Sequence, residues 1–284
     1  MEKIAVVTDT GSNLSFAQAK ELGIYLLPLQ ITIDETTYQD TLEISTLDIY
    51  NELANGKMPK TSMAAYQKIY DLFEELKKDY DTIFAVPLTN GLSTNASTMQ
   101  SIARELEMNV HVIDMYATCA LEKHVAIWIK KLVDEHKSSE EILKIIQPAI
   151  DESNSLILVK NLQHLKRGGR LTPMAAALAG LLKIYPVLHI NKSTEGRIDV
   201  LNKVRTEKRA DAYAIDKIMD DIDIQHTHIY IIHSNFLEGA DHFKKCFIEK
   251  GVPEQNIHID YISSVIAVHT GLDCIAIQYI REEN

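Results

Sequence analysis

The fold class of this 284-residue chain is decided by the stretch Pro87-Leu88-Thr89-Asn90-Gly91-Leu92-Ser93-Thr94-Asn95. It follows the apolar run 82–86, which is typical of a buried strand, and it precedes residues 96–106, whose apolar side chains recur at helical spacing. A strand, a hydroxyl-rich turn and a helix in this order indicate an α/β fold. The turn places backbone N–H groups at a helix N-terminus, which attracts anions. Its single glycine and its lack of lysine exclude a Walker loop and a dinucleotide fingerprint, and a simple helix cap by Ser93 or Asn95 is the alternative.

A second hydroxyl pair, Thr61-Ser62, stands directly before another predicted helix, in which residues 69, 72, 73 and 76 share an apolar face. We therefore expect two Thr/Ser loops, at 61–62 and 89–93, each at a helix N-terminus. Two such loops predict a site for a small acidic group more strongly than one cap does.

Strands alternate with helices through the first half of the chain, which predicts a parallel sheet covered by helices. The ligand edge of such a sheet lies at the carboxyl ends of its strands. A polar run predicts a boundary near residue 153, so we expect an N-terminal α/β domain at 1–153 and a C-terminal α/β domain at 154–284. The predicted elements of the second domain are strands at 156–159, 184–190, 197–203, 228–233, 257–261 and 274–280, and helices at 172–182, 206–219 and 237–250. The fold class is thus α/β with two domains, a Rossmann-like parallel sheet followed by a mixed sheet.

The charge, hydropathy and cysteine content of the chain exclude several classes of protein. The net charge of −11 argues against a nucleic-acid binder. Basic residues nevertheless cluster at 166–170 and 203–209, which favours binding to a defined partner or transient binding to anionic lipid. No apolar run approaches the roughly 20 residues of a membrane span. The first residues predict a strand rather than a signal peptide. Cys119, Cys246 and Cys274 are expected to be reduced core thiols, which indicates a cytoplasmic protein.

Several chemical alternatives remain open at this point. A zinc site from His226, His228 and His233 is disfavoured because period-two counting places His233 on the opposite face of the strand. A serine hydrolase would use Ser93 with His269, but Asn95 breaks the small-residue pattern of a nucleophile elbow. A phosphate-binding regulatory module is a third possibility.

Motifs along the whole chain, in order, resemble those of the DegV family. They are Thr8-Asp9-Thr10, Thr61-Ser62, Thr89-Asn90-Gly91-Leu92-Ser93, Val112-Ile113-Asp114, Leu162-x-x-Leu165-Lys166-x-Gly168-Gly169-Arg170, Lys203-Val204-Arg205 and His269-x-Gly271. The resemblance implies a DegV-like fold and a FakB-type fatty-acid-binding protein. Such a protein is not an enzyme: it presents a bound acyl chain to a separate fatty acid kinase, which makes acyl phosphate for phospholipid synthesis.

The resemblance also implies a ligand site. The carboxylate of a long-chain fatty acid such as palmitate, stearate or oleate is expected between the two domains, with its tail buried. The expected contacts are Thr61, Ser62, Asn90, Gly91, Ser93, Arg170 and His269. No cofactor, metal or catalytic residue is expected, and the competing interpretation is a serine esterase or thioesterase that uses Ser93 and His269. Departures from the usual family pattern at Ala65, Asn90 and Met115 concern the fit of the acyl chain.

Overall fold

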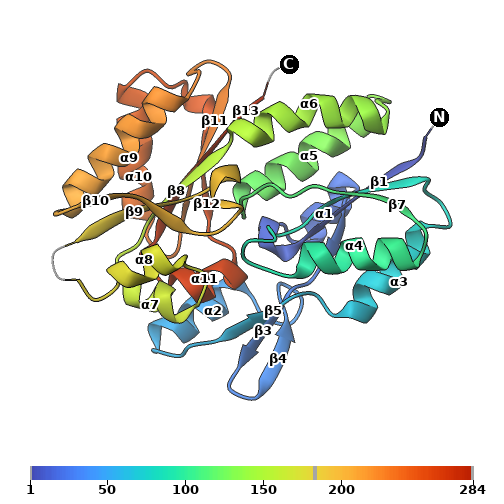
Figure 1. Ribbon diagram of the computed structural model, residues 1–284, viewed down its shortest axis with the longest axis horizontal. Coiled ribbons are helices and arrows are strands. Elements are labelled where there is room, and N and C mark those ends of the chain that lie inside the picture. The colour runs from blue at the N-terminus through green and yellow to red at the C-terminus, as the bar shows by residue number, and fades with distance from the viewer. Residues whose placement is uncertain (1, 182–183, 283–284) are drawn as a thin grey trace. The chain divides into compact units, whose positions relative to one another are not determined.

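The computed structural model describes residues 2–181 and 184–282, and the chain divides into two compact units. Residues 1–148 and 263–268 form the first unit, and residues 149–262 and 269–284 form the second. The chain crosses between the units three times: inside α6 (Ser139–Glu152), just before α11 (Ser264–Thr270), and inside α11. Figure 1 shows the elements in chain order.

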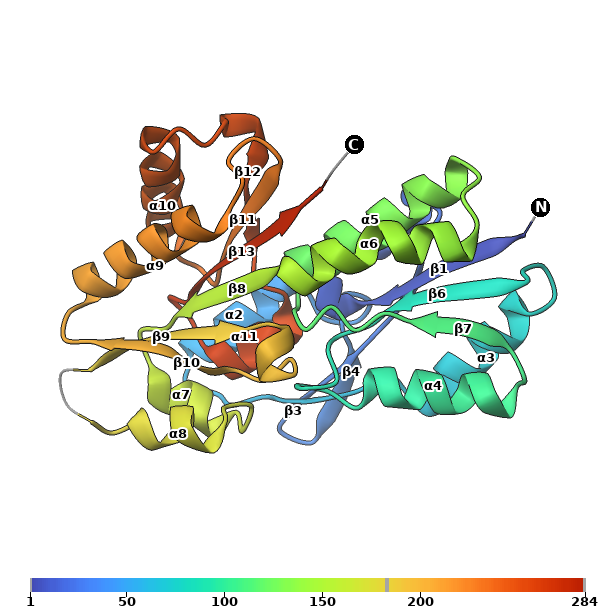
Figure 2. The ribbon, with the colours of Figure 1, turned by 45° about the horizontal axis from the view of Figure 1, so that its top comes forward.

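A four-stranded parallel sheet in the order β2-β1-β6-β7 forms the centre of the first unit. Its strands are β1 (Ile4–Asp9), β2 (Tyr25–Leu27), β6 (Thr82–Val86) and β7 (Asn109–Val112). The associated helices are η1 (Thr10–Ser12), α1 (Phe16–Leu22), α2 (Thr46–Ala54), α3 (Tyr66–Leu76), α4 (Asn95–Glu105) and α5 (Ala120–Asp134). Helices α3 and α4 lie on one face of the sheet and α5 on the other (Figure 2). The predicted parallel, helix-covered sheet is confirmed.

A small antiparallel sheet, in the order β4-β3-β5, interrupts this alternation. Its strands are β3 (Gln30–Ile33), β4 (Thr36–Gln39) and β5 (Lys60–Ser62). The hydroxyl pair Thr61-Ser62 therefore lies on a strand, and α3 begins only at Tyr66. The prediction that this pair stands at a helix N-terminus is wrong, because pairing with β3 holds the segment extended.

Local signals explain most helix boundaries. The side chain of Ser45 accepts a hydrogen bond from the backbone N–H of Asp48, which completes a capping box at the start of α2. Helix α5 begins only at Ala120, because Tyr116 and Cys119 have positive φ angles that a helix cannot include. This helix buries Trp128.

The second unit contains a six-stranded mixed sheet in the order β10-β9-β8-β13-β11-β12, in which only the β11–β12 pair is parallel. Its strands are β8 (Asn154–Leu158), β9 (Tyr185–Ile190), β10 (Asp199–Val204), β11 (Thr227–His233), β12 (Ile257–Tyr261) and β13 (Ile275–Arg281). Its helices are α7 (Leu162–Arg167), α8 (Pro173–Leu178), η2 (Lys192–Thr194), α9 (Glu207–Asp221), α10 (Leu237–Glu249) and η3 (Glu254–Asn256). The predicted mixed sheet is confirmed, and β9 and β10 pair as an antiparallel hairpin.

Different helices cover the two faces of this sheet (Figure 2). Helices α9 and α10 close a core that includes Phe243 and Phe247, whereas α7 and α8 lie on the other face. Helix α8 ends at Leu178, four residues before its predicted end, and Gly180 follows with a φ of +108°. The predicted last residue, Leu182, lies outside the described residues.

Among the described residues, no helix combines the length and the apolar character needed to cross a membrane. The three cysteines are free. Cys119 and Cys274 are buried, as predicted, but Cys246 is partly exposed on α10. The described part of the chain contains no cluster of His, Cys, Asp or Glu that could hold a metal ion.

Candidate ligand site

The carboxylate of Asp9 anchors the loop that leads from β6 to α4. Asp9 ends β1 and is fully buried. Its Oδ1 accepts from the N–H of Gly11 at 2.8 Å, and its Oδ2 accepts from the N–H of Leu88 at 2.9 Å and from Nδ2 of Asn95 at 2.6 Å. One side chain therefore fixes both ends of the 88–95 loop against the carboxyl end of β1.

A second buried carboxyl group, Glu122 of α5, lies beside Asp9. Burial and the neighbouring Asp9 raise the pKa of Glu122 far above its ordinary value, and burial also raises the pKa of Asp9. Asp9 accepts three N–H groups, which stabilise its ionised form, so we assign the carboxylate to Asp9 and the proton to Glu122. Glu122 then donates to Asp9 and accepts from the hydroxyl of Thr8 at 3.2 Å.

The loop itself is a tight turn that leaves the hydroxyl hydrogen of Ser93 available. The N–H groups of Leu92 and Ser93 both donate to the carbonyl oxygen of Thr89, each at 3.1 Å. The Oγ of Ser93 accepts from the N–H of Asn95 at 3.2 Å. Because that bond uses a lone pair of Oγ, the hydroxyl hydrogen can be donated to a ligand.

The backbone of the loop is less open to a ligand than the sequence suggested. The N–H of Ser93 is used within the turn, and that of Gly91 points at the hydroxyl of Thr89 at a long 3.5 Å. The N–H of Asn90 donates to Asp114 at 3.1 Å, while the Asn90 side chain is exposed. Side chains, rather than loop amides, are the main donors here.

The other hydroxyl pair lies in the small antiparallel sheet. Thr61 pairs in register with Ile31, and the exposed Ser62 donates from its hydroxyl to Gln30 at 3.0 Å. No helix dipole acts on either residue, so only their hydroxyl groups support an anion site.

In the second unit, His269 near the end of α11 packs against the turn that follows α7. A Cβ atom added to Gly168 would lie 3.0 Å from Nδ1 of His269 and 3.2 Å from its Cα, so a glycine at this position favours the close approach. Burial, with the charges of Arg170 and His164 adding to it, lowers the pKa of His269 to about 3. The imidazole is therefore neutral at physiological pH.

Arg170 is a cation without a counter-charge in the described part of the chain. Its Nη1 donates to the carbonyl oxygen of Gly168 at 2.7 Å, and it forms no ion pair with any described residue. Its side chain is half-buried, and burial lowers its pKa. A partly desolvated guanidinium with spare donors is a receptor for an anion.

Sequence reasoning missed a third buried acid, Asp40. It accepts hydrogen bonds from Ser264, the first residue of α11, and from Thr10, and burial raises its pKa to about 6. It thereby holds the start of the helix whose sixth residue is His269. Glu122 and Asp40 were missed because an acid among polar and apolar neighbours normally predicts an exposed side chain.

The predicted contacts thus come from both units. The first unit carries Thr61, Ser62, Asn90, Gly91 and Ser93, and the second carries Arg170 and His269. Within the first unit, the residues at 90–93 share one loop, whereas residues 61 and 62 belong to a different sheet.

Comparison with known proteins places these features in one family. A model of the DegV family, described as uncharacterised proteins, matches residues 3–282. A DegV domain-containing protein of Halalkalibacterium halodurans is 30% identical over the full length of both chains. The fatty-acid-binding DegV family protein of Streptococcus agalactiae superposes with a TM-score of 0.91 at 29% identity, covering 100% of each chain. DegV of Bacillus subtilis, described as a fatty acid binding protein, superposes with a TM-score of 0.87 at 26% identity, covering 99% of this chain and 100% of that one. From its sequence and its fold, this chain belongs to the DegV family.

Proposed function

We propose that this protein binds a long-chain fatty acid, with the tail buried and the carboxylate held by donors from both units. The observation that carries the proposal is the half-buried Arg170, which has no acidic partner in the described residues. The full-length likeness to DegV proteins that are described as fatty-acid-binding supports the choice of ligand.

The carboxylate head group, rather than the tail, determines whether the protein retains a fatty acid in competition with a lipid bilayer. Burying the tail is worth about 0.8 kcal/mol per CH₂, or roughly 12 kcal/mol for a palmitate-sized chain. A bilayer offers nearly the same gain, so the tail gives no preference for protein over lipid. Retention depends on satisfying a carboxylate that leaves water.

The proposed donors have distinct roles. Arg170 supplies the positive charge and charge-assisted hydrogen bonds. Thr61 and Ser93 donate hydroxyl hydrogens, and His269 acts as a neutral imidazole because of its depressed pKa. Ser62, Asn90 and Gly91 complete the surroundings of the head group.

The competing function is a serine esterase or thioesterase with Ser93 and His269, and the lowered pKa of His269 disfavours it. A general base works best with a pKa near the working pH, and the pKa of His269 is lowered to about 3. Turnover of a p-nitrophenyl acyl ester that is lost in Ser93→Ala would support the enzyme instead.

The first test measures fatty acid binding in matched arginine variants. Freshly purified protein is expected to retain an acyl chain in native mass spectrometry. Arg170→Ala is expected to weaken palmitate binding by about 1.5–3 kcal/mol, or roughly ten- to a hundredfold, because a charge-assisted hydrogen bond is lost. Arg167→Ala, which removes an exposed arginine at the end of α7, is the control and is expected to leave binding unchanged. Equal affinities in the two variants, or no acyl chain in the wild type, would refute the proposal.

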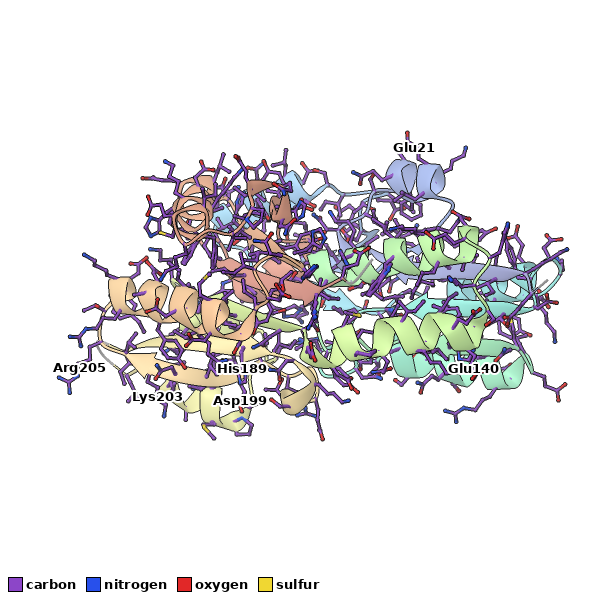
Figure 3. All side chains as sticks on the ribbon, turned by 90° about the horizontal axis from the view of Figure 1, so that it is seen from above. Glu21, Glu140, His189, Asp199, Lys203 and Arg205 are labelled. Carbon is purple, nitrogen blue, oxygen red and sulfur yellow. The ribbon has the colours of Figure 1, made fainter. Side chains whose placement is uncertain are left out.

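We further propose that the bound acid is presented to a fatty acid kinase, which converts it to acyl phosphate for phospholipid synthesis in the cytoplasm. Exposed basic residues near the end of β10, among them Lys203 and Arg205 (Figure 3), offer an electrostatic contact for a partner or for transient membrane binding. Free cysteines are typical of a reducing compartment. Acyl phosphate formation by a kinase that depends on this protein and falls in Lys203→Glu is the expected result.

A further inference from the structure

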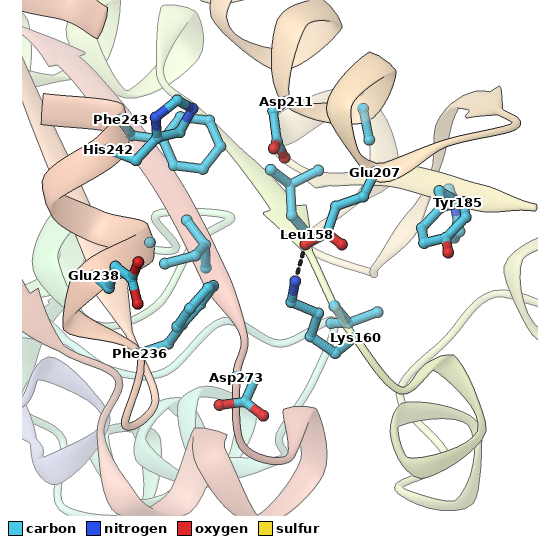
Figure 4. A pocket seen from close by; sticks show the side chains of 15 residues that line it. Leu158, Lys160, Tyr185, Glu207, Asp211, Phe236, Glu238, His242, Phe243 and Asp273 are labelled. Atoms are coloured by element: carbon cyan, nitrogen blue, oxygen red, sulfur yellow. Dashed lines mark ion pairs between the residues drawn. The ribbon is translucent and has the colours of Figure 1, made fainter. Parts of the chain in front are cut away.

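A cavity of about 330 Å³ opens in the second unit between the mixed sheet and helices α9 and α10 (Figure 4). It adjoins the end of β8 and the beginnings of β9, α9 and α10. None of the proposed fatty-acid contacts lines it. Its size falls within the range of small-molecule sites.

The walls combine apolar and aromatic side chains with an excess of negative charge. Leu158, Ile275 and Phe243 form apolar surface. Four lining side chains are carboxylates, namely Glu207, Asp211, Glu238 and Asp273. The lining contains one lysine, Lys160, and one histidine, His242. The acids therefore outnumber the cations even when the histidine is charged.

Only one of these carboxylates has an ionic partner among the described residues. Lys160 pairs with Glu207, and its Nζ also lies 5.1 Å from the centre of the Phe236 ring (Figure 4). An ammonium group thus already occupies a position between a carboxylate and an aromatic face in this cavity. Asp211, Glu238 and Asp273 have no such partner in the described part of the chain.

Asp211 is the most informative of the three. It is half-buried on α9, and burial raises its pKa, while Lys160 and His242 act on it only through their charges. A carboxylate that is partly removed from water without a hydrogen bond gains most from a cationic ligand. A metal ion does not meet this need, because no described group of acids and histidines could hold one.

We propose that this cavity binds a small organic amine, whose ammonium group meets Asp211 and the neighbouring carboxylates while its apolar body packs against Leu158, Phe243 and Ile275. An anion of the same shape would face three unpaired carboxylates. A neutral analogue would leave them unpaired. The inference is independent of the proposed fatty acid function, because the two sites share no residue.

Three probes with one apolar body test the charge preference: 2-phenylethylamine, 2-phenylethanol and phenylacetate. Backbone amide NMR titration of the wild type is expected to show shifts for residues 207–211 and 236–243 with the amine. The amine is expected to bind about tenfold more tightly than the alcohol, because only the amine compensates a half-buried carboxylate. Equal binding of amine and alcohol, tighter binding of phenylacetate, or no shifts around the cavity would overturn the proposal.

Matched variants locate the site. Asp211→Asn is expected to weaken amine binding by about tenfold and to leave the alcohol unchanged. Asp220→Asn removes an exposed acid from the same helix and serves as the control, with no effect expected. Asp273→Asn is a second variant, since Asp273 has a φ of +57° that asparagine tolerates. Amine affinity that is unchanged in both Asp211→Asn and Asp273→Asn would refute the assignment even if one of them folds poorly.

Discussion

At the scale of single residues, the buried pair of Asp9 and Glu122 controls the geometry of the proposed head-group loop. Asp9 binds the backbone of Leu88 and the side chain of Asn95, and Ser93 lies between those two residues. Glu122 touches none of the loop hydrogen bonds directly but supplies the proton that lets two carboxyl groups share one buried space. A positioning residue of this kind is invisible to motif searches that look only at the loop.

Substituting the two acids by their amides should separate their roles. Asp9→Asn is expected to lower the free energy of unfolding by about 2–4 kcal/mol, because an amide cannot accept all three N–H groups and buried donors are left unpaired. Glu122→Gln is expected to be nearly neutral below pH 4.5 and more stable than the wild type at pH 7, because glutamine also donates a hydrogen bond and needs no proton to do so. Urea unfolding of both variants measures the difference.

The pH dependence gives an independent check of the same pair. Glu122 is protonated in the folded state at a pH where the unfolded chain, with a pKa of 4.5, has released the proton. Its contribution to stability is therefore present below pH 4.5 and is lost as the pH rises toward the folded-state pKa. Glu122→Gln should abolish that loss, whereas a variant as unstable as Asp9→Asn would mean that Glu122 is ionised.

At the scale of elements, the sequence predicted what local chemistry determines and failed where tertiary pairing decides. The capping box that starts α2 needs only Ser45 and Asp48, three residues apart, and so can be read from the sequence. Thr61 and Ser62 were misassigned because their extended conformation depends on β3, thirty residues earlier, and not on their neighbours. The burial of Arg170 was equally inaccessible, since a basic residue beside two glycines normally predicts an exposed turn.

Asp40 offers a test of how the start of α11 is held. Its folded-state pKa of about 6 lies above the ordinary 3.8, so its contribution to stability is present below pH 3.8 and is lost as the pH rises to 6. The full effect is about 3 kcal/mol for a shift of this size. Unfolding free energies of wild type and Asp40→Asn, compared between pH 4 and 7, should therefore diverge in favour of the variant.

The control for this comparison is Glu74→Gln, which removes an exposed acid from α3. It should follow the wild-type curve throughout. Parallel curves for wild type and Asp40→Asn would show that Asp40 has an ordinary pKa in the folded protein.

At the scale of the whole molecule, ligand binding should appear as added stability. A ligand at a hundred times its Kd raises the free energy of unfolding by about 2.7 kcal/mol, which corresponds to a Tm increase of roughly 5–10 °C for a chain of this length. Palmitate is expected to produce this shift and methyl palmitate, which lacks the carboxylate, a much smaller one. Equal shifts would mean that the head group contributes nothing.

The domain boundary near residue 153 and the site shared by both units stay predictions, because sequence patterns report on each domain separately.

The position of Trp128 has a practical consequence for all of these measurements. It is the single tryptophan of the chain, and it is buried in α5, the helix that also carries Glu122. Its fluorescence is therefore a built-in optical probe of the N-terminal unit alone, whereas circular dichroism records both units. Melting curves that coincide by the two methods would identify one cooperative transition, and curves that separate would reveal which unit melts first.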